Sequence, residues 1–531
     1  MTSSTFKSFP HPLPFSRWEK GVKPLAVRDK GTLEAKQRGE GPPLPPGEGW
    51  GEGKGASSHR QWIFPCKLLF LFIFSLMLTG CSMWPAYQRP QSELPANWSG
   101  ASTQTLAVGE RWWTLYNDKA LDTLVTEAFE HNRDLALAAA RVDEARALAN
   151  VANSQRFPSF DATMQNSRAR SSAVSALPLP ASVPLVRNDH RVQLNVAYEL
   201  DLWGRLRSAS NAARADLLAT EAARETVRLA LGADVVRSYF TLLALDEQVS
   251  VTRRTLALRD DNLKLQRVRH TAGLIGDYQL RQLEAEIAAA QAQLPALERA
   301  HTAEELALAV LLGRSPRAII ETTVKRDAGS SQAPAPLTPP GLPSDLLLRR
   351  PDIAQAEQRL IAVNARIAAA RAALFPRISL TGYLGSESGA LRDLLSGPSL
   401  IWQLAFGLAQ PIFQAGRLSG EIDAIKAREQ QALAQYQKAV QEAFREVQQA
   451  LSAQTRSREI FEAEAARTAA LRDSLRLARI RYDNGLLSQL EVIDAERNLL
   501  AADLNRADAI RAQRVATADL VRALGGGWGG R

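Results

Sequence analysis

The sequence is poor in the residues that most often carry chemistry. Its 531 residues include only 2 cysteines and 6 histidines. The histidines are scattered, with no pair at the spacing of metal ligands, so we expect no metal site. A phosphate-binding Gly-Lys loop and a nucleophile elbow are also missing. These absences argue against an enzyme and against a bound cofactor.

The charge balance gives little support to nucleic-acid binding. The formal net charge is +9, but residues 1–80 hold 11 basic and 6 acidic residues, which leaves +4 for the rest of the chain. In that remainder 54 basic and 50 acidic residues are finely mixed. Such mixing is typical of solvated helix faces rather than of a phosphate-binding track. We therefore expect no nucleic-acid partner.

The amino-terminal stretch has the composition of a segment without a core. Residues 1–60 are low in apolar side chains and rich in glycine and proline. Such a composition buries too little apolar surface to fold. We interpret residues 1–60 as a low-complexity extension, and we hypothesise that the true translation start lies downstream of it.

Residues 61–80 have the layout of a secretory signal. Basic residues precede an apolar run at 68–78, which has the length of a signal-peptide core and is short for a bilayer span. The run ends in Leu78-Thr79-Gly80-Cys81, which resembles a bacterial lipoprotein signal. The resemblance implies cleavage before Cys81, acyl chains such as palmitate on Cys81, and, because Ser82 is not aspartate, sorting to the outer membrane. The alternative is a transmembrane anchor with an unmodified cysteine.

The rest of the chain contains two copies of one pattern. The first copy, at 119–313, begins with a predicted helix at 119–156 that stops before Pro158. The second, at 343–524, begins with a predicted helix at 345–374 that stops before Pro376. Each proline ends a helix and opens an extended segment. We assign 81–118 to a lipidated amino-terminal segment, 314–342 to a linker and 525–531 to a tail.

Each copy continues with a pair of strands. Apolar residues occupy every second position in 191–202 and in 402–409, and polar or small residues lie between them. This period of two fits a membrane strand with lipid on one side and a wet lumen on the other. A strand of a β-sandwich has the same alternation, so the strands alone leave both readings open.

The long helices favour the interpretation of these segments as membrane strands. Helical patterns without proline run over 205–270 and 417–484, each roughly 100 Å long. Each ends at a glycine turn and is followed by a returning helix, at 277–312 and 488–524. Helices of this length indicate coiled-coil pairing rather than a globular core.

Two copies supply only four strands, which are too few to close a membrane barrel of about eight or more. An open edge is not tolerated in lipid. If these are membrane strands, several chains must share one barrel.

Several motifs in this order resemble the outer membrane factor family, the TolC-like and OprM-like efflux channels, and its NodT-type lipoprotein branch. They are PAYQRP at 85–90, YELDLWGR at 198–205, GLPSDLLLRRPDI at 341–353, QPIF at 410–413 and ALGGGW at 523–528. The resemblance covers nearly all of 81–531. It implies a mainly α-helical homotrimer whose α-helical barrel continues into a shared 12-stranded outer-membrane β-barrel.

The same resemblance implies a function. The chain would be the passive outer-membrane channel of a tripartite pump that exports small toxic compounds or drugs. It would be lipid-anchored, with a long periplasmic portion, and would bind a periplasmic membrane-fusion adaptor and an inner-membrane transporter of the RND type. The alternatives are the outer-membrane duct of a type I protein secretion system, which shares the fold, and a periplasmic coiled-coil scaffold, which leaves the four amphipathic strands unexplained.

The second hairpin tip carries the candidate gate. Glu491 and Asp494 lie three residues apart and share a helix face, so symmetry would repeat them as acidic rings that favour cations. A solvated helix face is the ordinary alternative. By resemblance these two residues match the acidic residues of the family's periplasmic aperture, and Tyr482 matches a tyrosine that helps to close it. Leu487 stands where some members have the arginine partner of this gate.

The two tips share a second pattern, Arg-x-x-x-Gly-Leu. A plain helix–turn–helix needs the glycine but not the repeated arginine and leucine. By resemblance the pattern marks docking tips for the adaptor. The predicted docking residues are Arg269, Gly273, Leu274, Arg481, Gly485 and Leu486.

Overall fold

The computed structural model describes residues 87–91, 95, 109–174, 180, 182–321, 323–326 and 350–526. All of these residues belong to one compact unit of the chain, Thr79–Arg531. The predicted extension, the signal segment, Cys81 and most of the predicted linker lie outside the described residues.

The described chain follows one path twice, which confirms the predicted repeat. The first copy runs through α2 (Lys119–His131), α3 (Arg133–Ser154), β1 (Ser159–Arg170), β2 (Val186–Leu200), α4 (Arg205–Thr271) and α5 (Asp277–Leu311). The second runs through α7 (Pro351–Ala372), β3 (Arg377–Ser388), β4 (Leu400–Ala409), α8 (Arg417–Asp483) and α9 (Gln489–Ala523). Both long helices, α4 and α8, have 67 residues, and both returning helices, α5 and α9, have 35.

One predicted helix is wrong: the helix at 119–156 is two helices that meet at Asn132. The Asn132 backbone is extended, and its side-chain oxygen accepts hydrogen bonds from the backbone N–H groups of Asp134 and Leu135. Its side-chain nitrogen donates to the carbonyl oxygen of Leu311, 2.9 Å away. The side chain therefore caps α3 and ties the break to α5, which stabilises a new helix start over a continuous helix. A short helix, α6 (Pro316–Glu321), also lies within the segment assigned to the linker.

The four strands form one antiparallel sheet in the order β1-β2-β3-β4. Its register gathers the large apolar side chains on one face. Leu384 pairs with Leu194 of β2 and with Trp402 of β4. Met164 of β1 pairs with Val192, which lies two residues from Leu194 and so on the same face. Trp402 is 72% exposed and Met164 is 64% exposed, so this apolar face is open across the sheet.

The opposite face of the sheet is polar. Asn195 pairs with Asp161 of β1 and with Tyr383 of β3, which in turn pairs with Gln403 of β4. The predicted alternation in 191–202 and 402–409 is therefore confirmed, and it is in register across all four strands. Within this sheet β1 and β4 are the outer strands, each paired on one side.

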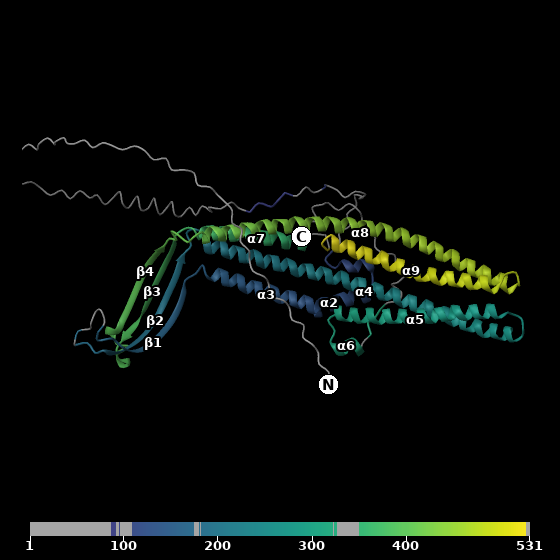
Figure 1. Cartoon of the computed structure of the whole chain (residues 1–531), viewed down its shortest axis with the longest axis horizontal. Coiled ribbons are helices and arrows are strands. Elements are labelled where there is room, and N and C mark those ends of the chain that lie inside the picture. Colours follow the sequence, from purple (N-terminus) through teal and green to yellow (C-terminus); the bar gives the residue numbers. More distant parts are fainter. Residues whose placement is uncertain are drawn as a thin grey trace, which may run out of the picture. The chain divides into compact units, whose positions relative to one another are not determined.

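Within this unit, the sheet lies at one end of the helices and the two hairpin tips lie at the other (Figure 1). Helices α3 and α7 pack against α4 on the sheet side, and α5 and α9 pack back along α4 and α8 on the tip side. Among the helices that the structure describes, none has both the length and the apolar composition that crossing a bilayer requires.

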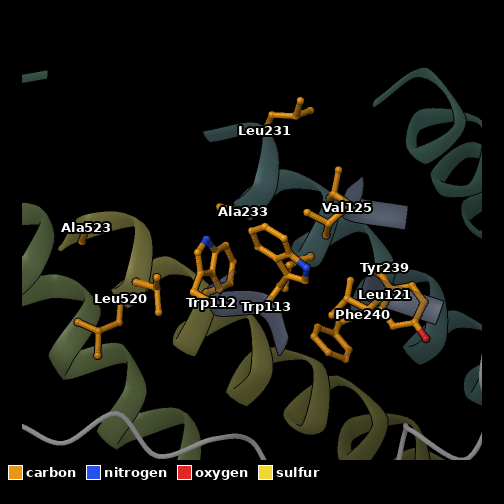
Figure 2. Packing of buried hydrophobic residues seen from close by; sticks show 14 of the residues in the cluster. Trp112, Trp113, Leu121, Val125, Leu231, Ala233, Tyr239, Phe240, Leu520 and Ala523 are labelled. Carbon is orange, nitrogen blue, oxygen red and sulfur yellow. The ribbon is translucent and has the colours of Figure 1, made fainter. Parts of the chain in front are cut away.

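The main hydrophobic core lies where α2, α4, α8 and α9 meet around the short helix η1 (Trp112–Tyr116) (Figure 2). Trp112 and Trp113 are 3% and 4% exposed. The Tyr116 hydroxyl donates to the carbonyl oxygen of Arg514, 2.7 Å away. The segment before the first repeat thus fastens α4 and α9 together midway between the sheet and the tips.

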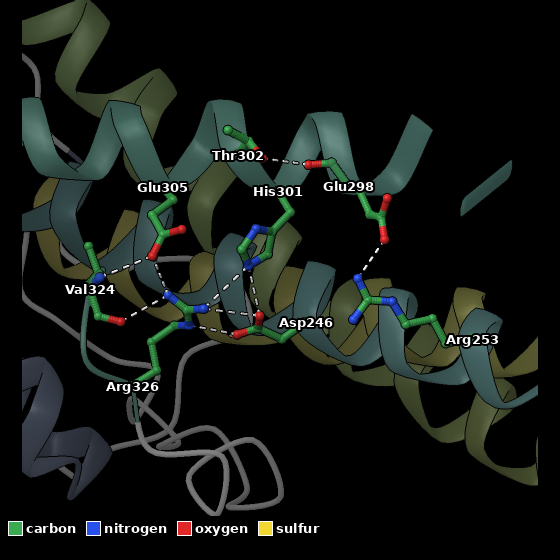
Figure 3. Close-up of polar contacts among 8 residues, drawn as sticks. All are labelled: Asp246, Arg253, Glu298, His301, Thr302, Glu305, Val324 and Arg326. Atoms are coloured by element: carbon green, nitrogen blue, oxygen red, sulfur yellow. Dashed lines mark hydrogen bonds and ion pairs between the residues drawn. The ribbon is translucent and has the colours of Figure 1, made fainter. Parts of the chain in front are cut away.

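A polar cluster holds the segment that follows α6 against α4 and α5 (Figure 3). Nε of Arg326 lies 2.7 Å from Oδ2 of Asp246 in α4, and its Nη1 lies 2.9 Å from Oε1 of Glu305 in α5. Nε2 of His301 lies 2.9 Å from Oδ1 of Asp246. These contacts attach the segment that follows α6 to both helices of the first hairpin.

Candidate gate and docking site at the hairpin tips

Each hairpin turns at a glycine in the left-handed conformation. Gly273 has φ 72° and Gly485 has φ 71°. The backbone N–H of Leu274 donates to the carbonyl oxygen of Arg269 at 2.9 Å, and the same bond in the second tip measures 2.8 Å. Among the described residues, no heavy atom comes within 4 Å of a Cβ built at either glycine. The backbone conformation, rather than a lack of space, therefore requires glycine at both turns.

The tips present apolar side chains to solvent. Leu274 is 72% exposed, Leu486 is 77% exposed and the neighbouring Tyr278 is 71% exposed. Arg481 is exposed beside them. Exposed apolar side chains gathered at the end of an element are typical of a contact surface for another protein. Five of the six predicted docking residues thus lie exposed at the two turns, and Arg269 differs from them.

Arg269 connects the two hairpins through Tyr482. The Tyr482 hydroxyl accepts a hydrogen bond from Nη1 of Arg269 at 2.7 Å and another from Nε2 of Gln266 at 3.1 Å. The Arg269 guanidinium also lies 6.0 Å from the centroid of the Tyr482 ring. The predicted gate tyrosine therefore has an arginine partner. It comes from the first hairpin, whereas position 487 of the second hairpin holds leucine.

Gln266 extends this contact to the returning helix of the second hairpin. It is only 2% exposed, and its Nε2 lies 3.3 Å from Oε1 of Gln489 at the start of α9. A small apolar cluster lies alongside, formed by Leu263, Leu280, Leu283, Ile287 and Ile493. The tips of both hairpins are thus held together by a buried polar contact and an apolar cluster.

A layer of ion pairs joins the helices of the two hairpins, farther from the turns than the contact between Gln266 and Tyr482. Arg259 is 3% exposed and donates to the backbone carbonyl oxygen of Glu286 at 3.0 Å. The carboxylates of Glu286 and Glu496 lie 3.6 and 3.9 Å from its guanidinium. Arg497 lies 3.6 Å from Glu286, and Arg479 lies 2.8 Å from Glu496. Because a buried arginine is costly without counter-charges, these carboxylates hold α4, α5, α8 and α9 in one arrangement.

The two predicted acidic gate residues both have partners within the chain. Oε2 of Glu491 accepts from the backbone N–H and the hydroxyl of Ser488, both at 3.0 Å, so Glu491 completes the capping box of α9. Oδ1 of Asp494 lies 2.9 Å from Nη2 of Arg497. An acidic ring is a property of an assembled oligomer, so the gate role of these residues stays a prediction.

Arg259 and Gln266 are two buried polar residues of α4 that the sequence did not lead us to predict. Both lie on the buried seam of α4, in which Arg259, Leu263 and Gln266 are spaced by four and three residues. A polar residue at such a seam position must find a partner on a facing helix. The spacing could have revealed that need, but it does not identify the partners.

Known proteins share this arrangement over most of the chain. The outer membrane efflux protein family matches residues 124–314 and 342–526. The solvent efflux pump outer membrane protein SrpC of Pseudomonas putida is 35% identical over 464 residues, which are 85% of this chain and 97% of that protein. The cation efflux system protein CusC of Escherichia coli is 34% identical over 469 residues, which are 87% of this chain and 99% of that protein.

Solved structures agree. The CmeC outer membrane channel of Campylobacter jejuni has a TM-score of 0.80 at 26% identity and covers 84% of this chain and 95% of that chain. A crystal structure of CusC has a TM-score of 0.73 at 31% identity and covers 84% of this chain and 100% of that chain.

The repeated hairpins, the two-faced sheet and these likenesses define an outer-membrane channel of the TolC-like type. The chain belongs to the outer membrane efflux protein family, and it functions as the outer-membrane component of an efflux pump.

Proposed function

We propose that three copies of this chain form one passive exit duct. The sheet carries the proposal, because its apolar face is continuous across four strands and its outer strands are paired on one side only. A membrane barrel has about eight or more strands, and lipid does not tolerate an open edge. In the proposed trimer, β4 of one copy pairs with β1 of the next, so that three copies close the barrel with the apolar face toward lipid.

In this arrangement the long hairpins continue the barrel as a periplasmic tunnel of roughly 100 Å. Acyl chains on Cys81 anchor each copy in the outer membrane. The duct performs no reaction, and the inner-membrane RND transporter supplies the energy. The cargo is small toxic compounds or drugs, in keeping with relatives named as efflux proteins for solvents and for cations.

The tips serve two purposes in the proposal. The contact of Arg269 and Gln266 with Tyr482 holds the two hairpins together in the closed state, and Glu491 and Asp494 form acidic rings around the aperture. The exposed Leu274 and Leu486, with the turns that display them, are contacts for the periplasmic adaptor.

Two neighbouring residues of β4 provide a matched test. Leu404 lies on the exposed apolar face and Gln403 on the polar face. Arginine on a lipid-facing side of a barrel costs about 2–4 kcal/mol near the bilayer midplane, while lumen positions tolerate charge. We expect Leu404→Arg to reduce the yield of trimer from outer-membrane fractions strongly, and Gln403→Arg to leave it near that of the parent.

The yield and the number of chains are measured together, by native mass spectrometry of the detergent-extracted protein. Equal yields for the two variants, or a parent protein that is monomeric after extraction, would contradict a shared barrel.

A further inference from the structure

A short amino-terminal stretch is fastened to the helices far from its place in the sequence. Nε and Nη2 of Arg89 donate to Oε1 and Oε2 of Glu357 in α7, at 2.6 and 2.8 Å. This is a bidentate ion pair, in which two N–H groups of the guanidinium face the two oxygens of the carboxylate. The two residues are 268 positions apart in the chain. The segment at 87–91 therefore has a specific attachment point on the helical body.

The attachment point is largely enclosed on the helix side. The Glu357 side chain is 12% exposed, whereas the Arg89 side chain is 51% exposed. Burial, followed by the nearby negative charge of Glu357, raises the pKa of the Tyr87 phenol to about 12. The same causes raise the pKa of Tyr436 in α8, a residue that is 1% exposed. We name Tyr87, Arg89, Glu357 and Tyr436 the Glu357 anchor. An enclosed carboxylate needs a counter-charge, so Arg89 stabilises this site through its charge as well as through packing.

The extended length of the chain from Cys81 to Arg89 is close to the length of α7 between Glu357 and the end of the helix. Arg89 lies eight positions after Cys81, and a fully extended chain of that length spans at most roughly 28 Å. Glu357 lies 15 residues before Ala372, the last residue of α7, a rise of roughly 23 Å. β3 then begins at Arg377. A lipid on Cys81 can therefore reach the sheet end of α7, with only roughly 5 Å of extended chain to spare.

We propose that the Glu357 anchor sets the reach of the lipid on Cys81, so that the acyl chains meet the membrane surface at the sheet end of α7. The proposal rests on the proposed acylation of Cys81 and adds a length restraint to it. The partner of this segment is a lipid surface, and the anchor is the fixed end of the tether. Arg89 and Glu357 are positioning residues for the lipid.

Changing the length of the tether tests the restraint. Deleting residues 83–85 keeps Cys81 and Ser82 and shortens the reach by roughly 10 Å. We expect this deletion to leave acylation intact and to lower the yield of outer-membrane trimer several-fold. An insertion of three residues after position 83 keeps the anchor and lengthens the tether, and we expect it to assemble like the parent.

Releasing the anchor separates its role from a general effect of the deletion. Arg89→Ala combined with Glu357→Gln removes the ion pair without leaving a buried unpaired carboxylate. In the deletion background we expect this pair of substitutions to restore the trimer yield, because the freed segment can slide toward the sheet. Acylation is measured by mass spectrometry of the amino-terminal peptide, and assembly by native mass spectrometry of the membrane extract.

Each contrary result has a distinct meaning. An acylated deletion variant that assembles like the parent would overturn the length restraint alone. A deletion variant that the anchor substitutions do not rescue would show that the Glu357 anchor does not limit the reach. An unacylated parent protein would overturn both the lipid anchor of the proposed function and the restraint built on it.

Discussion

Replacing Tyr482 by phenylalanine removes one hydroxyl and keeps the ring. The change deletes the hydrogen bonds from Arg269 at 2.7 Å and from Gln266 at 3.1 Å. A hydrogen bond from a charged donor contributes about 1.5–3 kcal/mol and a neutral one about 0.5–1.5 kcal/mol. Because Arg269 is partly exposed, we take the lower ends, which together give about 2 kcal/mol per chain. If the contact exists only in the closed state, the closed-to-open ratio falls about 30-fold for each chain.

Single-channel recording of the purified trimer in planar bilayers measures this ratio as the fraction of time spent in the open level. We expect Tyr482→Phe to raise that fraction and the mean conductance. Tyr278→Phe is the matched control, because Tyr278 lies at the first tip and is 71% exposed, and we expect it to behave like the parent. A folded Tyr482→Phe trimer with the parent's open fraction would refute the role of this contact in closure.

Two further predictions concern the tips. Glu491→Gln combined with Asp494→Asn removes both charges while glutamine retains the capping box, and we expect lower cation selectivity in the same recordings; unchanged reversal potentials in a salt gradient would exclude these residues from the aperture. Gly273→Ala combined with Gly485→Ala forces side chains into left-handed turns, at about 1–2 kcal/mol each, and we expect weaker adaptor binding and lower drug resistance in a strain that depends on this pump. Full resistance with both substitutions would argue against docking at these turns.

The repeat made most of the fold predictable. Pro158 follows the end of α3 and Pro376 follows the end of α7, and the long helices begin after Gly204 and Gly416, which both have positive φ. A local rule predicts a break at Pro295, yet α5 is continuous through it and equals α9 in length. The second copy therefore predicts the extent of α5 better than the local effect of Pro295 does.

The break at Asn132 could not be predicted in this way. Its side chain caps α3 in the first copy, and its other partner, Leu311, is 179 residues away. Polar residues occur at intervals in any amphipathic helix, so the sequence does not distinguish a cap from a solvated position. The decisive contact is tertiary.

In the candidate site, too, local features could be predicted from the sequence and tertiary contacts could not. Gly273 and Gly485 follow from the rule that a left-handed helix end requires glycine. The contact of Arg269 with Tyr482 joins residues 213 positions apart on different hairpins. Periodicity identifies the face of a helix on which a residue lies, but it does not identify the residue of the other hairpin that the side chain contacts.

The most direct test of a closed, shared duct is a planar-bilayer recording of the purified, lipidated protein beside its mass in detergent. We predict a trimer with a small, cation-selective conductance whose selectivity falls as acid protonates the carboxylates of the aperture. A monomer without conductance would contradict a shared duct, because its strands would then form no common barrel and the hairpins would be those of a periplasmic scaffold.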